Sequence, residues 1–214
     1  MPYGWLASIT GDVGAGPITA NVDVSFADLA RHLRFAAMVY AEARRQWFVG
    51  GVDALYVSLS GAKAIAFRGD TGSFDLKIHL PLIEPFVGYS VGNATWTFDV
   101  FTGARYWGLK NELSVNRPNG NSRDFTARDD WWDALGGARL SGTIIPHLRF
   151  TAGGDAGGGG AKSDWQVHGD VGYDVSHLWT VGLSYRYLSV DREENRSTLD
   201  VALKGLVVAG TYHF

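Results

Sequence analysis

Hydrophobic and polar positions alternate along most of this chain, and residues 197–214 show the pattern most clearly. One face of that segment is apolar and aromatic, whereas the other is small or polar. The apolar face consists of Leu206, Val208, Gly210, Tyr212 and Phe214. Because successive side chains of a β-strand point to opposite faces, this period of two predicts a strand. Such a strand closes a transmembrane β-barrel, with its apolar face outward, or ends a soluble sandwich or lipocalin-like barrel.

The same alternation recurs upstream and predicts about ten long strands. The segments are 5–13, 33–43, 48–56, 74–91, 96–105, 132–140, 148–152, 165–175, 179–187 and 197–214. We therefore expect an all-β chain that folds as a closed antiparallel transmembrane barrel of about ten strands. Residues 18–26 could form an additional short strand, and a count of twelve stays open.

Residues 26–33 are the best helix candidate. Phe26, Leu29 and Leu33 recur at intervals of three and four, which places them on one side of a helix. We expect this short helix to lie in the first long loop, folded into or over the mouth of the barrel.

Polar or glycine-rich segments separate the predicted strands. We expect loops at 61–72, 116–123, 157–164 and 191–196, and tight turns at 44–46, 91–94, 143–146 and 176–177. A β-bulge is expected between Pro81 and Pro85, because proline inside a strand needs an edge or a bulge. Short turns on one side and long loops on the other are typical of outer-membrane barrels, whose short turns face the periplasm.

Strand length and aromatic placement favour a membrane barrel over a soluble one. Many of the predicted strands exceed the usual length of about five to six residues. They approach the roughly nine to eleven residues that cross a bilayer. Aromatic residues stand near strand ends, as in the interfacial girdles of membrane barrels. These residues are Trp5, Tyr89, Trp96, Tyr173, Trp179 and Phe214.

Length and composition narrow the range of functions. A chain of 214 residues suits a single domain, so we treat residues 1–214 as one barrel. The net charge of −3 offers no basic excess for nucleic acid. The absence of cysteine removes thiol catalysis, disulfides and cysteine-ligated metal sites. No apolar stretch reaches the roughly 18 residues of a membrane-spanning helix.

The face opposite the apolar one carries charges of both signs on strand after strand. The residues that we expect to form an inward charge network or a constriction are Asp53, Asp99, Arg105, Asp133, Arg139, Arg149, Asp155, His168, Asp170 and Arg186. The pattern Gly-Ala-Arg occurs twice, at 103–105 and 137–139; its glycine leaves room for a long neighbour, and its arginine can reach a carboxylate. Side chains can largely fill a barrel of this size. We therefore favour a salt-bridged plug over a conducting constriction.

Five segments resemble small outer-membrane β-barrel proteins of Gram-negative bacteria. They are VDVSFADL (22–29), GARYW (103–107), GGDAGGGGAKSDWQ (153–166), SYRYLSVD (184–191) and the terminal TYHF. The resemblance extends over nearly the whole chain and implies the fold and an outer-membrane location. Because most members of this family have no assigned function, it implies no activity.

Catalytic chemistry finds little support in the sequence. An omptin-type protease would need paired aspartates that face an Asp/His pair, for which Asp129, Asp130, His168 and Asp170 are the nearest candidates. Adjacent aspartates, however, would point to opposite faces of a strand. His79, His168 and His213 belong to no nucleophile motif. We expect no enzyme, no cofactor and no metal site.

The sequence thus predicts an outer-membrane protein with a structural role in the cell envelope, or a porin-like narrow pore for small solutes. A membrane enzyme at the barrel rim, acting on lipid or peptide, is one alternative. A soluble calycin-like binding barrel is another. The expected partners are the lipid bilayer of the outer membrane and other envelope proteins.

Overall fold

The structure is a computed structural model of residues 1–214. It describes the backbone of all residues except 16–17, 68–69, 94, 117–121 and 195–196. The side chains of 15, 18, 62–67, 70–74, 113, 115–116, 122–123 and 197 also lie outside the described part.

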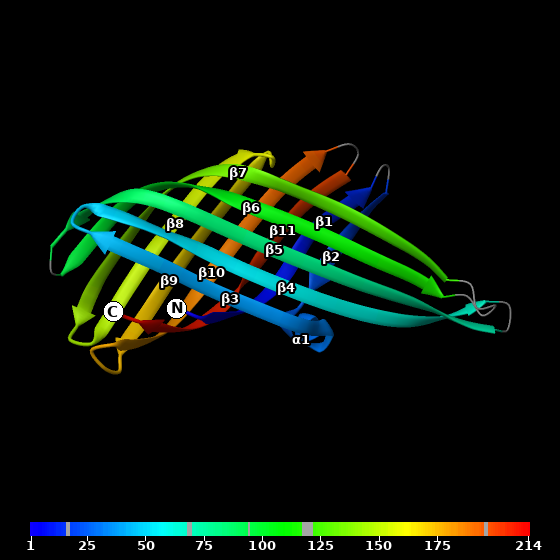
Figure 1. Ribbon diagram of the computed structural model, residues 1–214, viewed down its shortest axis with the longest axis horizontal. Coiled ribbons are helices and arrows are strands. Elements are labelled where there is room, and N and C mark those ends of the chain that lie inside the picture. Colours follow the sequence, from blue (N-terminus) through cyan, green and yellow to red (C-terminus); the bar gives the residue numbers. More distant parts are fainter. Residues whose placement is uncertain (16–17, 68–69, 94, 117–121, 195–196) are drawn as a thin grey trace.

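Over the described residues, eleven antiparallel strands form one sheet. Figure 1 shows that this sheet is curled. They are β1 (Tyr3–Ala15), β2 (Ile18–Val24), β3 (Leu33–Arg45), β4 (Phe48–Phe67), β5 (Asp70–Gly92), β6 (Trp96–Asn116), β7 (Ser122–Ile145), β8 (Leu148–Gly159), β9 (Ser163–Asp174), β10 (Trp179–Glu194) and β11 (Ser197–Tyr212). Their order in the sheet is β2-β1-β11-β10-β9-β8-β7-β6-β5-β4-β3. The all-β prediction is confirmed, and the optional strand at 18–26 is present as β2.

The two ends of the sheet differ. Both chain termini lie at one end, called here the terminal end, together with the turns at Gln46–Trp47 and Pro146–His147 (Figure 1). Gln46 and His147 have φ values of 55° and 71°, which let these two-residue turns reverse the chain. At the opposite end, called the far end, β4 to β7 extend beyond the other strands.

Most segments predicted as far-end loops are instead continuations of strands. The predicted loop at 61–72 is strand through Phe67 and again from Asp70, so that prediction is wrong over its described residues. The predicted loop at 157–164 shrinks to 160–162, and β10 takes up 191–194. Predicted loop residues 117–121 lie outside the described residues. Polar side chains suggested loops here, but an antiparallel partner can satisfy the backbone whatever the side chains are.

Pro81 and Pro85 lie inside β5 without the predicted bulge. The register between β5 and β6 is the same on both sides of Pro81, with His79 opposite Lys110 and Leu82 opposite Trp107. The strand tolerates the ring because Gly108 faces it: a Cβ at Gly108 would stand 2.7 Å from Pro81 Cγ. Gly108 therefore accommodates the proline ring, and the strand needs no bulge at Pro81.

The predicted helix is present as α1 (Phe26–His32) and ends one residue earlier than expected. Ser25 caps it, since its Oγ accepts a hydrogen bond from the backbone N–H of Asp28 at 3.2 Å. The helix stands between β2 and β3 and contacts β1 and β4. Within the described part of the chain, no helix is both long and apolar enough to span a membrane.

β1 meets β3 at one short contact near the terminal end. Pro2 forms an antiparallel bridge with Val39, and the amide N–H of Tyr40 donates to the Met1 carbonyl at 2.9 Å. Farther along, β2 pairs with β1 from Ile9 to Ala15. β2 and β3 therefore lie one after the other beside β1, with α1 between them.

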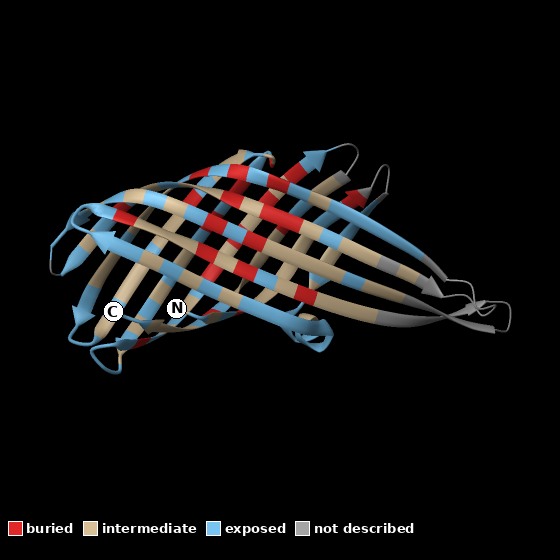
Figure 2. Ribbon diagram, in the orientation of Figure 1, coloured by how far each residue is buried: buried red, intermediate tan, exposed pale blue. Residues whose placement is uncertain are grey.

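Buried and exposed positions alternate along the strands (Figure 2). The exposed positions of the outer face include many large hydrophobic residues, while the buried residues of the inner face include both apolar and charged ones. Along β10, Leu183 and Tyr185 are 53% and 50% exposed, whereas Arg186 and Leu188 are 7% and 0% exposed. This arrangement is the reverse of a water-soluble sandwich, in which the large apolar side chains are buried.

Trp5 departs from the predicted aromatic girdle. Trp5 points to the inner face and is 6% exposed. It is spaced by two residues from Tyr3 and Ala7, which are partly buried on the same face, whereas its neighbour Leu6 is exposed on the other face. The other five predicted girdle residues are exposed: Tyr89, Trp96, Tyr173, Trp179 and Phe214.

Candidate functional site

The centre of the inner face holds a buried cluster around Arg105. The guanidinium donates from Nη2 to Glu84 and Asp155 at 2.8 and 2.7 Å, and from Nε to Glu84 at 2.9 Å. Asp164 accepts a further hydrogen bond from Nη1. The side chains of Arg105 and Asp164 are 0% exposed. Three carboxylates thus share one arginine in a place that solvent does not reach; we call these four residues the Arg105 cluster.

Gln166 connects the Arg105 cluster to a second ion pair. Its Nε2 donates to Glu84 at 3.2 Å, and its Oε1 accepts from Arg186 Nε at 2.8 Å. Arg186 Nη1 in turn donates to Asp53 at 2.7 Å. Because β10 and β4 stand six places apart in the sheet order, this ion pair crosses the interior and does not run along one wall.

A third group surrounds Arg139, nearer the terminal end. Arg139 donates from Nη2 to Asp99 at 2.8 Å and to Glu42 at 2.6 Å, and from Nη1 to the Tyr40 hydroxyl at 2.8 Å. Arg44 donates to both carboxylate oxygens of Asp99 at 3.0 and 2.7 Å. These five residues, the Arg139 cluster, join β3 to β6 and β7 across the inner face.

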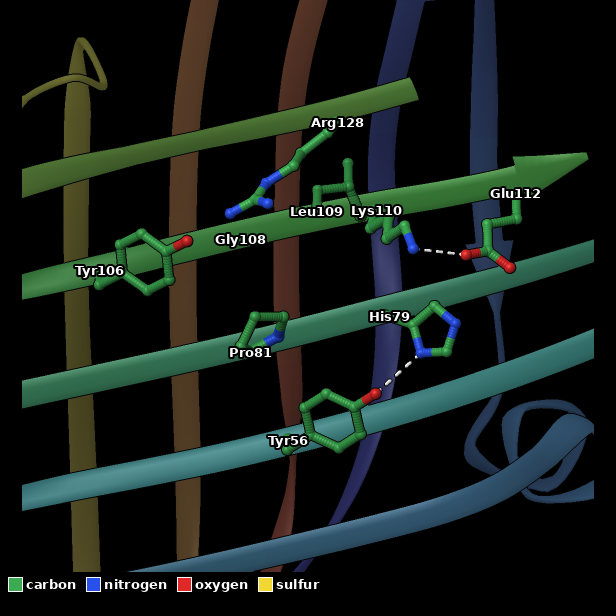
Figure 3. Close-up of a pocket in the computed structure, with 9 residues that line it drawn as sticks. All are labelled: Tyr56, His79, Pro81, Tyr106, Gly108, Leu109, Lys110, Glu112 and Arg128. Atoms are coloured by element: carbon green, nitrogen blue, oxygen red, sulfur yellow. Dashed lines mark hydrogen bonds and ion pairs between the residues drawn. The ribbon is translucent and has the colours of Figure 1, made fainter. Parts of the chain in front are cut away.

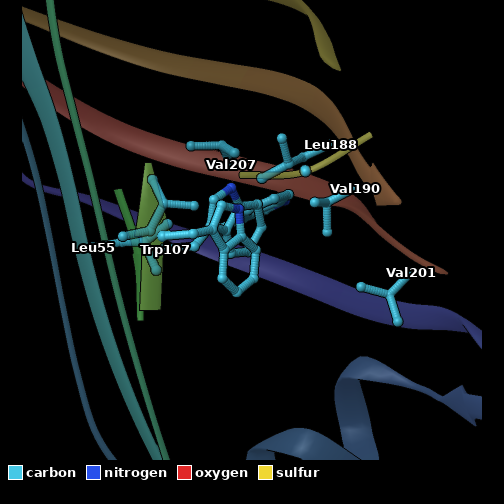
Figure 4. Close-up of a cluster of buried hydrophobic side chains, with 10 residues drawn as sticks. Leu55, Trp107, Leu188, Val190, Val201 and Val207 are labelled. Atoms are coloured by element: carbon cyan, nitrogen blue, oxygen red, sulfur yellow. The ribbon is translucent and has the colours of Figure 1, made fainter. Parts of the chain in front are cut away.

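An apolar layer packs against these polar clusters, with most of its members farther toward the far end, and Figure 4 shows its packing. Its buried members are Trp5, Leu55, Leu82, Trp107, Trp131, Ala161, Leu188, Val190, Val201 and Val207. Trp107 and Trp131 stack with their ring centroids 5.7 Å apart. Their indole N–H groups donate to Asp164 and Asp133, each at 2.8 Å. The two layers are thus joined by hydrogen bonds as well as by contact.

The inner residues expected from sequence fall into separate groups. Arg105 and Asp155 share one cluster, Asp53 and Arg186 form the second ion pair, and Arg139 lies with Asp99 in the third group.

The remaining expected residues stand apart from those groups. Asp133 accepts the amide N–H of Ala161 at 2.7 Å and so holds the β8–β9 turn. Arg149 pairs with Asp174 at 2.9 Å at the terminal end, with its side chain 57% exposed. His168 and Asp170 are neighbours on β9, 3.7 Å apart.

Three buried residues of the central network were not among the expected site residues. Glu84 lies between Pro81 and Pro85 and was overlooked, although it is two residues from the buried Leu82 and points to the same face of β5. Asp164 fell in a predicted loop, and Gln166 carries no charge. Gln166 lies two residues before His168 on β9 and therefore points to the same face. This spacing could have identified it as an inner residue.

The histidines and aspartates considered for catalysis do not assemble a nucleophile with its base. Thr180 donates its proton to Asp174 at 2.6 Å, so the hydroxyl does not direct that proton at His213, 2.9 Å away. Asp129 binds Arg192 at 3.0 Å on the inner face, while Asp130 is exposed on the other face. Within the described residues, no group of three or more histidines and carboxylates could hold a metal ion.

Ion pairs also line the rim of the far end. Arg192 lies 4.4 Å above the Trp131 ring and pairs with Asp129, which places a charged side chain over the apolar layer. Lys162, in the β8–β9 turn, pairs with Glu193 of β10. The hydrogen bond to Glu193 raises the pKa of Lys162 above its ordinary value.

Comparisons with known proteins give little further information. No protein-family model matches the chain, and no curated protein matches its sequence. Among solved structures, the chain is similar to the translocator domain of the autotransporter NalP from Neisseria meningitidis, with a TM-score of 0.45 and 15% sequence identity. The match covers 97% of this chain and 86% of that chain. A likeness at this level is too low to assign a fold or an activity.

Proposed function

We propose that the protein is an integral outer-membrane β-barrel whose lumen is closed by its own side chains, and that its role in the cell envelope is structural. The observation that carries this proposal is the reversed sidedness of the sheet. Ion pairs fill its interior, while Val, Leu, Trp and Tyr side chains cover its exterior. In a bilayer the apolar side chains of the exterior would contact hydrocarbon, while the charged side chains of the interior form ion pairs with one another.

Two rows of aromatic residues on the outer face support a membrane location. Four strands carry an aromatic residue at each end of an eight-residue interval: Phe48 and Tyr56, Phe98 and Tyr106, Trp165 and Tyr173, and Trp179 and Tyr187. Eight residues span about 26 Å along a strand. At the usual strand tilt of about 40°, the interval becomes about 20 Å of height, near the apolar band of outer-membrane barrels.

Closure of the wall is part of this proposal, and the placement of β2 and β3 one after the other beside β1 supports it. With β2 and β3 counted as one place in the wall, the eleven strands of the described residues give ten wall positions. An even number of positions is the rule for bacterial outer-membrane barrels and leaves both termini at one end. The hydrogen bond from Tyr3 to Asp53 at 2.7 Å joins β1 to β4 and supports this ring.

The filled interior favours a structural role over a porin-like pore. The Arg105 cluster and the apolar layer are consecutive seals, and both consist of buried side chains. A solute could pass only if both layers moved. The rim-enzyme alternative has no assembled catalytic group among the described residues to support it.

Insertion into lipid tests this proposal. Urea-unfolded protein diluted into phosphatidylcholine vesicles is expected to fold, to float with the vesicles after a carbonate wash, and to migrate differently on gels before and after boiling. Dilution into buffer without lipid or detergent is expected to give aggregate, because the apolar exterior stays exposed. A folded monomer in detergent-free buffer would contradict the proposal and favour the soluble calycin-like alternative.

A further inference from the structure

A groove lies on the outer face of the sheet, where β4 to β7 extend toward the far end. Its volume is about 370 Å³, and its lining is shown in Figure 3. Pro81 and Gly108 form the floor, because the missing side chain of Gly108 accommodates the proline ring. Tyr56 and Tyr106 stand along one side, Lys110 and Glu112 stand along the other, and the guanidinium of Arg128 points toward Tyr106.

The groove presents a histidine and two cations in a row across three strands. His79, Lys110 and Arg128 are direct neighbours in the register of β5, β6 and β7. The Lys110 and Arg128 side chains are 46% and 66% exposed, so both can reach a ligand. The Tyr56 hydroxyl lies 2.8 Å from His79 Nδ1 and adds a neutral hydrogen-bonding group.

Carboxylates accompany these cations. Glu112 lies 2.5 Å from Lys110 Nζ, and Asp130 lies 3.1 Å from Arg128 Nε. A ligand that offers hydroxyl donors as well as negative charge complements both members of these pairs. Tyrosine rings beside such groups can pack against the apolar face of a sugar. This combination fits a phosphorylated sugar better than a simple anion.

The height of the groove matches a lipid headgroup. Tyr56 and Tyr106 belong to the far-end aromatic row, and the row of His79, Lys110 and Arg128 begins two residues beyond Pro81 on β5. On the other side of the aromatic row, Ile83 and Val87 are 41% and 46% exposed on the apolar exterior. A lipid whose acyl chains lie along that exterior would place its headgroup at the cations, as aromatic belts and basic residues do at membrane interfaces.

We propose that this groove binds the phosphorylated sugar headgroup of a glycolipid in the leaflet around the far end of the barrel. The inference rests on the proposed membrane location. Lys110 and Arg128 hold the phosphate, Glu112 and Asp130 accept sugar hydroxyls, and Tyr56 and Tyr106 pack beside the ring. The bound lipid would anchor the long strands β4 to β7 at their exit from the membrane.

The test measures glycolipid binding by the folded full-length chain in detergent, with lipid A as the probe, by native mass spectrometry. Wild-type protein is expected to retain lipid A, whereas Lys110→Gln/Arg128→Gln is expected to bind it at least about tenfold more weakly, since two charge-assisted contacts are lost. Lys162→Gln, which removes an exposed cation elsewhere on the far end, should bind as the wild type does.

Two competitors identify the ligand chemistry. Phosphatidylglycerol carries charge without a phosphorylated sugar, and inorganic phosphate carries no lipid; neither should displace lipid A at equal concentration. Equal binding by the double variant, or displacement by either competitor, would overturn the inference. Because each variant is first shown to insert into vesicles, loss of glycolipid binding is distinguishable from failure of the membrane proposal itself.

Discussion

Arg105→Met is expected to lower the free energy of unfolding by about 3–5 kcal/mol, because it leaves buried carboxylates without their cation. Glu84, Asp155 and Asp164 all form ion pairs with this guanidinium, whose side chain is 0% exposed. Urea titration of the protein folded in detergent micelles, followed by the gel shift of the folded form, measures the change.

Two further variants separate charge from packing at Arg105. Arg149→Met removes a terminal-end arginine whose side chain is 57% exposed, and should cost no more than about 1 kcal/mol. Adding Glu84→Gln and Asp164→Asn to Arg105→Met should recover part of the loss, because fewer buried charges remain unpaired. A loss at Arg105 equal to that at Arg149, or no recovery, would contradict the buried network.

Wild-type protein inserted in a planar bilayer is expected to give no steady current, and a current should appear only when both inner layers are opened. Arg105 and Trp107 stand two residues apart on β6, one in each layer. Arg105→Ala leaves the apolar layer in place, and Trp107→Ala leaves the remaining polar network. Each single variant should therefore be silent, whereas Arg105→Ala/Trp107→Ala should show discrete channel events.

The current measurement separates a sealed barrel from the porin-like alternative. Only protein with the gel mobility of the folded form is counted, because Trp→Ala in a packed interior costs about 3–5 kcal/mol. Steady events from the wild type would mean that the interior conducts. Events from either single variant would mean that one layer alone forms the seal.

Alternation along the chain was enough to predict the wall of the fold. The faces of β9 and β10 follow it residue by residue, and Leu206, Val208, Tyr212 and Phe214 of the last segment are exposed as predicted. The helix was predictable because Phe26 and Leu29 break the period of two, and Ser25 is a good cap. Alternation and capping are properties of neighbouring residues, so they predict individual strands and helices.

The interior contacts could not be predicted, because they depend on which strands face each other. Arg105 and Asp164 are 59 residues apart in sequence, and Arg186 and Asp53 are 133 apart. The alternation along each strand indicates that such residues point inward. Which of them contact each other depends on the register between strands and on the curvature of the sheet. Trp5 was misplaced for a related reason: an aromatic residue near a strand end suits either face, and only its phase with Tyr3 and Ala7 resolves the choice.

The most direct measurement of the central claim is the environment of the outer face in a folded protein. The chain has no cysteine, so one introduced thiol reports one position. Leu183→Cys places it midway between the aromatic pair Trp179 and Tyr187, and Thr126→Cys places it on the long part of β7 beyond the far-end aromatic row. In vesicles, a water-soluble maleimide should label Thr126→Cys readily and leave Leu183→Cys unlabelled. A fluorophore attached to the thiol of Leu183→Cys should be quenched by lipids that carry a spin label in their acyl chains. Equal labelling of the two positions, with no quenching at Leu183→Cys, would contradict the claim that this sheet faces lipid.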